Sequence, residues 1–321
     1  MSESKWTLEK LVEGVRSGDR RALARSITLI ESADGLAYEL VRELYPHTGK
    51  SYSVGVTGPP GVGKSSLISS LVRHVRAAGA GVGVISVDPS SPFTQGALLG
   101  DRIRLADHFL DPEVFIRSMG TRGHLGGIAE ATLQAALVLD AAGKDLLFLE
   151  TVGTGQSEVE IISIADTVLL VLMPGSGDSI QALKAGIMEI PDVIAVNKRD
   201  HPAAKTMMNE VRSILSLSED TGWRPPIVLT EAVRGEGIEE LWEQVQAHRT
   251  HLEENGLLAS RRADHLAGEV FAVASARAKN HLVRAVADDP ELRRLLAEVQ
   301  RRELDPLTAV REIMEKVFKV E

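Results

Sequence analysis

The chain has 321 residues, of which 44% are hydrophobic and 25% are charged. This composition excludes a disordered or fibrous chain and is typical of a globular protein with one large domain or two smaller ones. The absence of cysteine excludes disulfides, thiolate metal sites and cysteine nucleophiles. The net charge of −9 repels phosphate backbones, so we expect no nucleic-acid partner.

The sequence carries no signal for a membrane. No apolar stretch approaches the roughly 18 residues that a membrane-spanning helix requires, and the first residues lack the apolar core of a signal peptide. We therefore expect a cytoplasmic protein without a membrane partner.

Residues 1–50 are predicted to form a helical N-terminal segment. Apolar residues recur at helical spacing in three groups, which are Leu8, Leu11, Val12 and Val15, then Leu23, Ile27 and Ile30, then Leu36, Leu40 and Leu44. Each group predicts one short helix, and Pro46 ends the last of them.

Residues 51–254 are predicted to form an α/β domain. The candidate strands are Ser53–Thr57, Val82–Asp88, Val114–Arg117, Asp145–Glu150, Thr167–Met173, Val193–Asn197 and Ile227–Leu229. The candidate helices are Lys64–Ala77, Gly100–His108, Ile128–Ala142, Ser179–Glu189, Ala203–Leu217 and Ile238–His251. The strands are rich in Val, Ile and Leu without polar alternation, which indicates burial on both faces. The pattern therefore predicts a parallel sheet with helices on both faces.

Residues 255–321 are predicted to form a helical C-terminal arm. Helical patterns opened by a capping or proline signal cover Asp264–Val286, Pro290–Arg302 and Pro306–Phe318. Two interpretations stay open from the residues alone. The helices form either a solvated bundle packed on the core or an arm that joins two copies of the chain.

A phosphate-binding loop is predicted between the first strand of the α/β domain and the helix after it. The P-loop pattern is matched by Gly58, Pro59, Pro60, Gly61, Val62, Gly63, Lys64 and Ser65, and Ser66 follows in the first helical turn. Glycines let successive backbone N–H groups point at a phosphate at the positive end of a helix. We expect Lys64 to supply a catalytic positive charge between the β- and γ-phosphates and Ser65 to ligate Mg²⁺. The pattern indicates a nucleoside triphosphate site.

Three acidic residues are candidates for the surroundings of the metal ion. Glu150 ends the fourth predicted strand and Gly153 follows it, where P-loop proteins usually have Asp-x-x-Gly, with the carboxylate near the magnesium and the glycine N–H near the γ-phosphate. Asp88 ends a strand that points toward the phosphate edge, and Asp101 begins a predicted helix. Each acid is also suited to cap a helix, so both interpretations stay open.

The residues after the sixth predicted strand indicate selectivity for guanine. Asn197, Lys198 and Asp200 fit the Asn-Lys-x-Asp motif of GTP-binding proteins. The Asp200 carboxylate is able to accept hydrogen bonds from the ring N–H and the amino group of guanine, a donor pair that adenine lacks. A backbone N–H after the next strand is expected to contact the guanine O6. The candidates for this contact are Glu231, Ala232 and Val233, where GTPases usually have Ser-Ala.

Six segments together resemble one family. They are Val-Gly-Val-Thr-Gly-Pro-Pro-Gly-Val-Gly-Lys-Ser (54–65), Asp-Pro-Ser-Ser-Pro (88–92), Gly-Asp-Arg-Ile-Arg (100–104), Thr-Arg-Gly-His-Leu-Gly-Gly (121–127), Glu-Thr-Val-Gly-x-Gly-Gln-Ser-Glu (150–158) and Asn-Lys-x-Asp (197–200). They resemble the MeaB-type GTPases, which are chaperones of adenosylcobalamin-dependent methylmalonyl-CoA mutase. The resemblance spans nearly the whole chain, including its helical ends.

The resemblance implies a homodimeric P-loop GTPase that binds GTP, GDP and Mg²⁺. Such a protein associates with the mutase, gates transfer of adenosylcobalamin into it and protects it from inactivation. By position, Ser65, Asp88, Asp101 and Glu150 would form the magnesium environment. The loop at residues 174–179 resembles the family's mobile segment that responds to the partner, which makes Asp178 a candidate catalytic residue.

Hydrolysis is expected to be slow in the isolated protein. In Ras-like GTPases a glutamine directly follows the Asp-x-x-Gly glycine and orients the attacking water. That position is Thr154 here, and Gln156, a further candidate catalytic residue, lies two residues further on. We therefore expect a bound mutase to accelerate turnover.

Three other functions are compatible with parts of the sequence. A nickel-delivery GTPase would need a Cys or His cluster, which this chain lacks. An ATP-dependent kinase linked to amino-acid transport conflicts with Asp200 and with the missing kinase catalytic loop. A non-catalytic nucleotide-dependent scaffold is disfavoured by the intact Lys64, Ser65 and Glu150.

A few charged residues in the last helical patterns are predicted to be solvated. His248, His251 and Glu254 share one helical face and are expected to face water instead of a metal ion. Arg261 and Arg262 are expected to be solvated helix charges.

Overall fold

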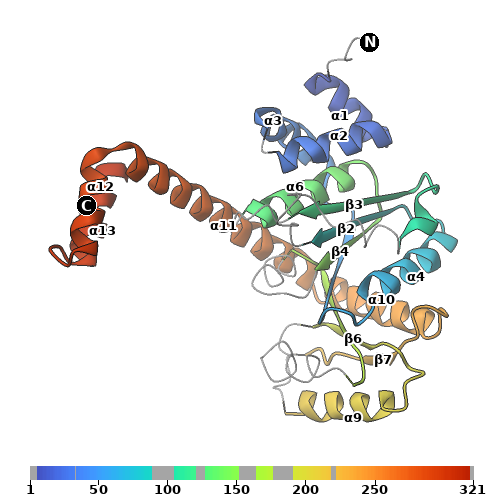
Figure 1. The fold of residues 1–321 in the computed structure, drawn as a ribbon. Coiled ribbons are helices and arrows are strands. Elements are labelled where there is room, and N and C mark those ends of the chain that lie inside the picture. Colours follow the sequence, from blue (N-terminus) through green and yellow to red (C-terminus); the bar gives the residue numbers. More distant parts are fainter. Residues whose placement is uncertain are drawn as a thin grey trace. The chain divides into compact units, whose positions relative to one another are not determined.

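The computed structural model describes residues 6–32, 34–88, 105–120, 127–151, 164–175, 191–217 and 222–318 (Figure 1). The chain divides into two compact units, Met1–Leu266 and Ala267–Glu321. The first unit contains the sheet and the predicted nucleotide site.

One parallel sheet forms the centre of the first unit. Its strands are β1 (Tyr52–Thr57), β2 (Val82–Asp88), β3 (Val114–Gly120), β4 (Leu146–Thr151), β5 (Thr167–Leu172), β6 (Val193–Val196) and β7 (Ile227–Leu229). They lie in the order β3-β2-β4-β1-β5-β6-β7, and each neighbouring pair is parallel. The predicted parallel sheet is confirmed, and β1 lies at its middle. Ligands of such sheets bind at the carboxyl ends of the strands, where the order of connection reverses.

Both faces of the sheet are covered by helices. Val82 and Val84 of β2 pack in the cluster that includes α4 (Lys64–Ala77) and α10 (Ile238–Glu254). The alternate residues Ile85 and Val87 pack on the opposite face, in the cluster that includes α6 (Gly127–Ala141). On that second face, α9 (Ala204–Leu215) covers β5 and β6. Apolar residues at successive strand positions are therefore buried on both sides, as the missing polar alternation predicts.

Three N-terminal helices add a further layer beside α6 (Figure 1). They are α1 (Leu8–Arg16), α2 (Arg20–Glu31) and α3 (Gly35–Leu44), followed by the 3₁₀ helix η1 (Tyr45–His47). Side chains of Thr7, Asp19 and Asp34 accept hydrogen bonds from the first backbone N–H groups of the three α-helices, respectively. The predicted apolar series are buried together with α6 in one cluster.

Some predicted elements differ from the structure or lie outside its described part. A helix is predicted over Gly100–His108. In the described part of this range, residues 105–108, the structure has the 3₁₀ helix η2 (Ala106–His108). The predicted helix Ser179–Glu189 lies outside the described residues. Strand β3 runs three residues beyond its predicted end because its pairing with β2 continues to Gly120.

The C-terminal helices are α11 (Leu257–Asp288), α12 (Pro290–Gln300) and α13 (Pro306–Phe318). Helix α11 begins seven residues before the predicted start at Asp264. Within the second unit α12 packs on α13, and the Lys316 ammonium lies 2.8 Å from the Asp289 carboxylate that caps α12. In the described residues, no helix is both long and apolar enough to cross a membrane.

Candidate nucleotide-binding site

The predicted phosphate loop joins the carboxyl end of β1 to the first turn of α4. Three of its glycines have positive φ angles, +137° at Gly58, +79° at Gly61 and +96° at Gly63. A Cβ at Gly58 would lie 2.1 Å from the Val171 carbonyl oxygen, and one at Gly63 would lie 2.5 Å from Nδ2 of Asn197. Only glycine fits either position, because both the backbone conformation and the neighbouring atoms exclude a side chain. The loop is therefore held close to β5 and to the predicted base-binding motif.

Lys64 is the first residue of α4 and is 6% exposed. Its ammonium group donates hydrogen bonds to the carbonyl oxygens of Gly58 (2.7 Å) and Pro59 (3.1 Å). The side chain thus folds back across the loop, and its charge lies inside the curve of the backbone. An anion at the N-terminus of α4 would meet this ammonium together with the helix dipole.

Ser65 and Glu150 are in direct contact. The Ser65 hydroxyl donates to Oε1 of Glu150 at 2.6 Å, and the Ser86 hydroxyl donates to Oε2 at 2.8 Å. Ser86 is opposite Glu150 because β2 and β4 are neighbours in register. Sequence analysis did not identify Ser86; its signal is a single polar residue within the apolar strand Val-Gly-Val-Ile-Ser-Val-Asp. The site therefore offers a buried hydroxyl and carboxylate, which are hard oxygen donors of the kind that suits Mg²⁺.

Asn197 connects the phosphate loop to the loop after β7. Its Nδ2 donates to the Val62 carbonyl oxygen at 2.8 Å. Its Oδ1 accepts from the Ala232 backbone N–H at 3.1 Å and from the Thr230 hydroxyl at 3.3 Å. The Ser70 hydroxyl of α4 also donates to the Ala232 carbonyl oxygen at 2.6 Å. Three segments far apart in the sequence are thus held together by short polar contacts.

Asp200 and Glu231 form a carboxyl pair in the same region. Asp200 is exposed, whereas Glu231 is 8% exposed. The hydrogen bond from Glu231 lowers the pKa of Asp200 below its usual value. Burial, followed by the bond to Asp200, raises the pKa of Glu231. Asp200 is therefore ionised at neutral pH, in the form that accepts the guanine N–H groups.

The family of the chain follows from comparison with known proteins. The family model described as "Methylmalonyl Co-A mutase-associated GTPase MeaB" matches residues 23–287. The chain belongs to the MeaB family. A putative GTPase of Pyrococcus abyssi is 46% identical over 97% of both chains. The methylmalonic aciduria type A homolog, mitochondrial, of Mus musculus is 33% identical over 79% of this chain and 66% of its own length.

A solved structure has the same fold. The structure titled LAO/AO transport system kinase is 27% identical, has a TM-score of 0.76 and covers 99% of both chains. Together with the family match, this shows a P-loop GTPase fold with helices at both termini. The MeaB-family chain accordingly binds guanine nucleotide and hydrolyses GTP to GDP and phosphate.

The described residues bring most of the predicted site residues of this MeaB-family GTPase to one edge of the sheet. The phosphate loop, Lys64, Ser65, Glu150, Asn197 and the segment Glu231–Val233 are connected by the contacts given above. Lys198 follows Asn197 with a φ of +58°, and its ammonium lies 3.0 Å from the Met173 sulfur. Asp88 ends β2, and its side chain is not described. The predictions for Asp101, Gly153, Gln156 and Asp178 lie outside the described residues.

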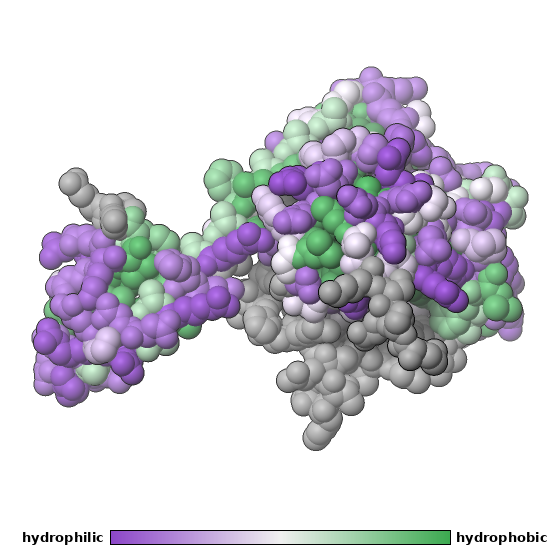
Figure 2. Space-filling view, turned by 90° about the horizontal axis from the view of Figure 1, so that it is seen from above, coloured by the Kyte–Doolittle hydropathy of each residue, from purple (hydrophilic) through white to green (hydrophobic). Residues whose placement is uncertain are grey.

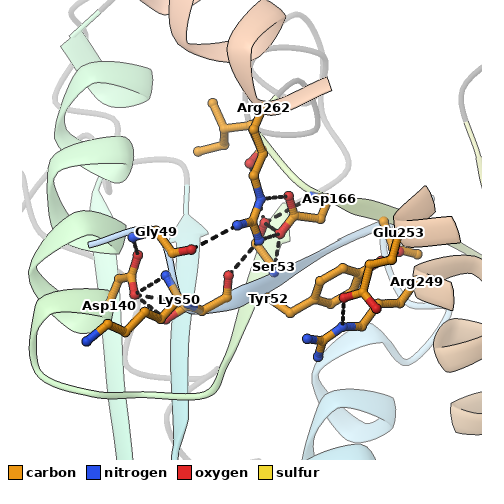
Figure 3. Close-up of polar contacts among 12 residues, drawn as sticks. Gly49, Lys50, Tyr52, Ser53, Asp140, Asp166, Arg249, Glu253 and Arg262 are labelled. Atoms are coloured by element: carbon orange, nitrogen blue, oxygen red, sulfur yellow. Dashed lines mark hydrogen bonds and ion pairs between the residues drawn. The ribbon is translucent and has the colours of Figure 1, made fainter. Parts of the chain in front are cut away.

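A second polar cluster lies at the opposite, amino-terminal edge of the sheet, and it corrects the prediction that Arg262 is solvated (Figure 3). The Arg262 guanidinium makes two 2.7 Å hydrogen bonds to the Asp166 carboxylate and also donates to the carbonyl oxygens of Gly49 and Ser51. Arg261 is likewise paired with Asp192 at 2.9 Å. The first turns of α11 are therefore anchored to the segments that precede β1, β5 and β6.

Arg262→Ala is expected to destabilise the first unit by about 2–3 kcal/mol, because it leaves the buried Asp166 carboxylate without its counter-ion. The exposed pair of Arg42 and Glu43 offers a matched control. Arg42→Ala is expected to cost less than about 0.5 kcal/mol. Urea unfolding followed by tryptophan fluorescence measures both, since all three tryptophans lie in the first unit. Equal midpoints for the two variants would contradict the anchoring role of Arg262.

His248 corrects a second prediction, because it is buried and not solvated. It is 1% exposed, its Nδ1 lies 2.8 Å from the Thr167 hydroxyl, and its Nε2 lies 3.3 Å from Asp192. Burial lowers the pKa of His248 from 6.5 to about 4. In the apolar series of α10, His248 continues the spacing of Leu241, Val245 and Leu252, a signal that sequence analysis missed.

Stability is expected to fall as the pH drops from about 6.5 toward 4, because unfolded chains bind a proton at His248 that the folded protein excludes. The stabilising effect of neutral His248 is complete above pH 6.5 and is lost on acidification by at most about 1.4 kcal/mol per pH unit. Urea unfolding of the wild type and of His248→Gln at several pH values tests this. The variant is expected to have the smaller pH slope; parallel slopes would refute the assignment.

Proposed function

We propose that this chain is a GTP-driven chaperone that associates with methylmalonyl-CoA mutase. In this role it gates the loading of adenosylcobalamin and protects the mutase from inactivation. The observation that carries the proposal is the match of residues 23–287 to a family described as mutase-associated. The relative named after methylmalonic aciduria supports the same metabolic setting.

We assign the nucleotide contacts residue by residue. The loop from Gly58 to Ser66 binds the phosphates, and Gly153 adds an N–H at the γ-phosphate. Asn197, Lys198 and Asp200 bind guanine, with a backbone N–H from the segment Glu231–Val233 at O6. In this structure the Ala232 N–H donates to Asn197 and the Glu231 N–H donates to the Glu236 carbonyl oxygen, which leaves the Val233 N–H of that segment for the O6 contact.

Mg²⁺ is assigned to the oxygen donors beside the phosphate loop. Magnesium commonly binds through one or two carboxylates together with substrate phosphates and water, and the buried pair of Ser65 and Glu150 fits that requirement. In the described residues, no group of three or more His, Cys, Asp or Glu side chains forms a metal cluster. Asp88 and Asp101 complete the proposed environment. The ion would neutralise the phosphates, and Glu150 and Ser65 would hold it.

Turnover in this proposal depends on the partner. Lys64 stabilises the charge that develops on the phosphates. Gln156 and Asp178 complete the catalytic set when the mutase is bound, so that isolated hydrolysis is slow. A cytoplasmic location stays a prediction.

Nucleotide-dependent association with the mutase tests the proposal. The full chain and purified methylmalonyl-CoA mutase are run together on size-exclusion chromatography with GDP, with a non-hydrolysable GTP analogue, with the matching ATP analogue and without nucleotide. The expected result is co-elution that changes with the guanine nucleotide and not with the adenine nucleotide. Separate elution under every condition would overturn the proposal.

We further propose that residues 255–321 form a homodimerisation arm attached to a GTPase domain at 51–254 and a helical segment at 1–50. Apolar surface interrupts the polar surface of the C-terminal unit (Figure 2). Large exposed apolar side chains of that unit are Val270, Phe271, Val283, Leu296, Leu307 and Val310. Such surface is costly in a monomer and supports association.

Sedimentation velocity tests the arm. Phe271→Asp, at a side chain that is 73% exposed, is expected to convert dimers to monomers. Tyr38→Asp, at a 64% exposed position of α3, is the matched control and is expected to remain dimeric. A wild-type chain that sediments as a monomer at all concentrations would contradict the arm.

A further inference from the structure

Ser86 places a hydroxyl group inside the apolar part of β2. It is 3% exposed, and its neighbours Ile85 and Val87 are buried as well. A buried hydroxyl is costly unless a hydrogen bond replaces those that it would make with water. The register of β2 and β4 pairs Ser86 with Glu150, and the Ser86 hydroxyl donates to Oε2 of that residue at 2.8 Å. The polar residue in this strand is therefore matched to the acid beside the phosphate loop.

The Glu150 carboxylate is held from two sides. Ser86 donates to Oε2 from β2, and the Ser65 hydroxyl donates to Oε1 at 2.6 Å from the first turn of α4. Hydrogen bonds to an ionised oxygen are short and about twice as strong as those between neutral groups. Glu150 is buried, so little water competes with them. Each carboxylate oxygen thus has a hydroxyl donor on a different element, which fixes the rotation of the group as well as its position.

The contact with Ser86 matters because the acid at this position is a glutamate. P-loop proteins usually have an aspartate here, and glutamate has one more rotatable side-chain bond to restrain. Mg²⁺ requires near-ideal octahedral geometry from its oxygen ligands, so a longer and freer carboxylate needs a further restraint. A carboxylate has about four lone-pair sites, and two hydroxyl donors leave the others for a metal ion. Ser86 is therefore suited to orient Glu150 without blocking it.

We propose that Ser86 is a positioning residue for Mg²⁺ binding, which holds the Glu150 carboxylate in the orientation that the metal site requires. The inference rests on the proposed magnesium site and adds to it a residue of β2 that acts only through Glu150. Partners that orient metal ligands in this way commonly contribute about 10- to 100-fold to metal affinity. Loss of the Ser86 hydroxyl is expected to weaken Mg²⁺ binding by about tenfold, at the lower end of that range, because Ser65 still holds the other oxygen.

The affinity for a non-hydrolysable GTP analogue, measured by calorimetry on the full chain with saturating Mg²⁺ and with EDTA, tests this role. The ratio of the two affinities isolates the contribution of the metal ion, because damage to the nucleotide site lowers both. Ser86→Ala is expected to have a ratio about tenfold below that of the wild type, with an unchanged affinity in EDTA. Ser86→Thr keeps a hydroxyl on a residue suited to a strand and is expected to recover most of the ratio.

Ser118 of β3 offers a matched control. It is buried and lies opposite Ser86 in the register, on the side of β2 away from β4. Ser118→Ala therefore makes the same change one strand further from Glu150, and it is expected to keep the wild-type ratio.

Three results would overturn the inference, and they differ in what else they refute. A wild-type ratio in Ser86→Ala removes the role of Ser86 while the metal site stands. An equal loss of affinity with Mg²⁺ and with EDTA makes Ser86 a structural residue of the sheet. A wild-type chain that binds the analogue equally well with Mg²⁺ and with EDTA refutes the proposed magnesium site, and the role of Ser86 with it.

Discussion

Lys64→Ala is expected to lower GTP hydrolysis by the full chain by about 100- to 1,000-fold, the usual effect of removing one preorganised electrostatic contact to a transition state. The Lys64 ammonium lies inside the phosphate loop, where it donates hydrogen bonds to the carbonyl oxygens of Gly58 and Pro59. In the nucleotide complex the Lys64 ammonium would pair with the phosphates of GTP. Alanine has no positive charge to replace it. Single-turnover release of phosphate measures the effect.

The exposed Lys205 of α9 provides the control. Lys205→Ala removes the same charge from the first unit and is expected to hydrolyse GTP at the wild-type rate. Circular dichroism of both variants checks that the fold is retained. Hydrolysis by Lys64→Ala within a few-fold of the wild type would contradict the placement of the γ-phosphate at this loop.

Asp200→Asn is expected to weaken GDP binding by at least about 100-fold, because a site built to accept two N–H groups from guanine then presents a donor to one of them. The same change is expected to strengthen binding of xanthosine diphosphate, whose second carbonyl replaces the guanine amino group. Calorimetry with the two nucleotides measures the exchange of preference.

Asp107→Asn is the matched control for this substitution. Asp107 lies in η2 with its side chain 75% exposed and pairs with Arg73. The control is expected to keep the wild-type preference for GDP. Equal losses of GDP and xanthosine diphosphate in Asp200→Asn would point to a collapsed loop instead of a changed base contact.

The parts of the fold that depend on local pattern were predictable from the sequence. Strands β4 and β5 contain the unbroken apolar runs Leu146–Leu149 and Val168–Leu172, which require helices on both faces and so predict a parallel sheet. The phosphate loop was recognisable because its glycines are required by the backbone itself, as the positive φ angles of Gly58 and Gly63 show.

Contacts between distant segments could not be predicted in the same way. The bond from Asn197 to the Val62 carbonyl joins residues 135 positions apart. Arg262 reaches Asp166 across 96 positions, and no local pattern distinguishes it from a solvated arginine. The burial of His248 was predictable in principle, since this residue lies on the buried face of α10. The prediction was wrong because ionisable side chains are usually exposed to solvent.

Single-turnover hydrolysis of GTP, with and without purified methylmalonyl-CoA mutase, tests the proposed chaperone function most directly. The prediction is a slow rate for the isolated chain and a clearly faster rate with the mutase, with no effect of an unrelated protein at the same concentration. A rate that is fast in isolation and unchanged by the mutase would contradict a GTPase whose cycle is governed by that partner.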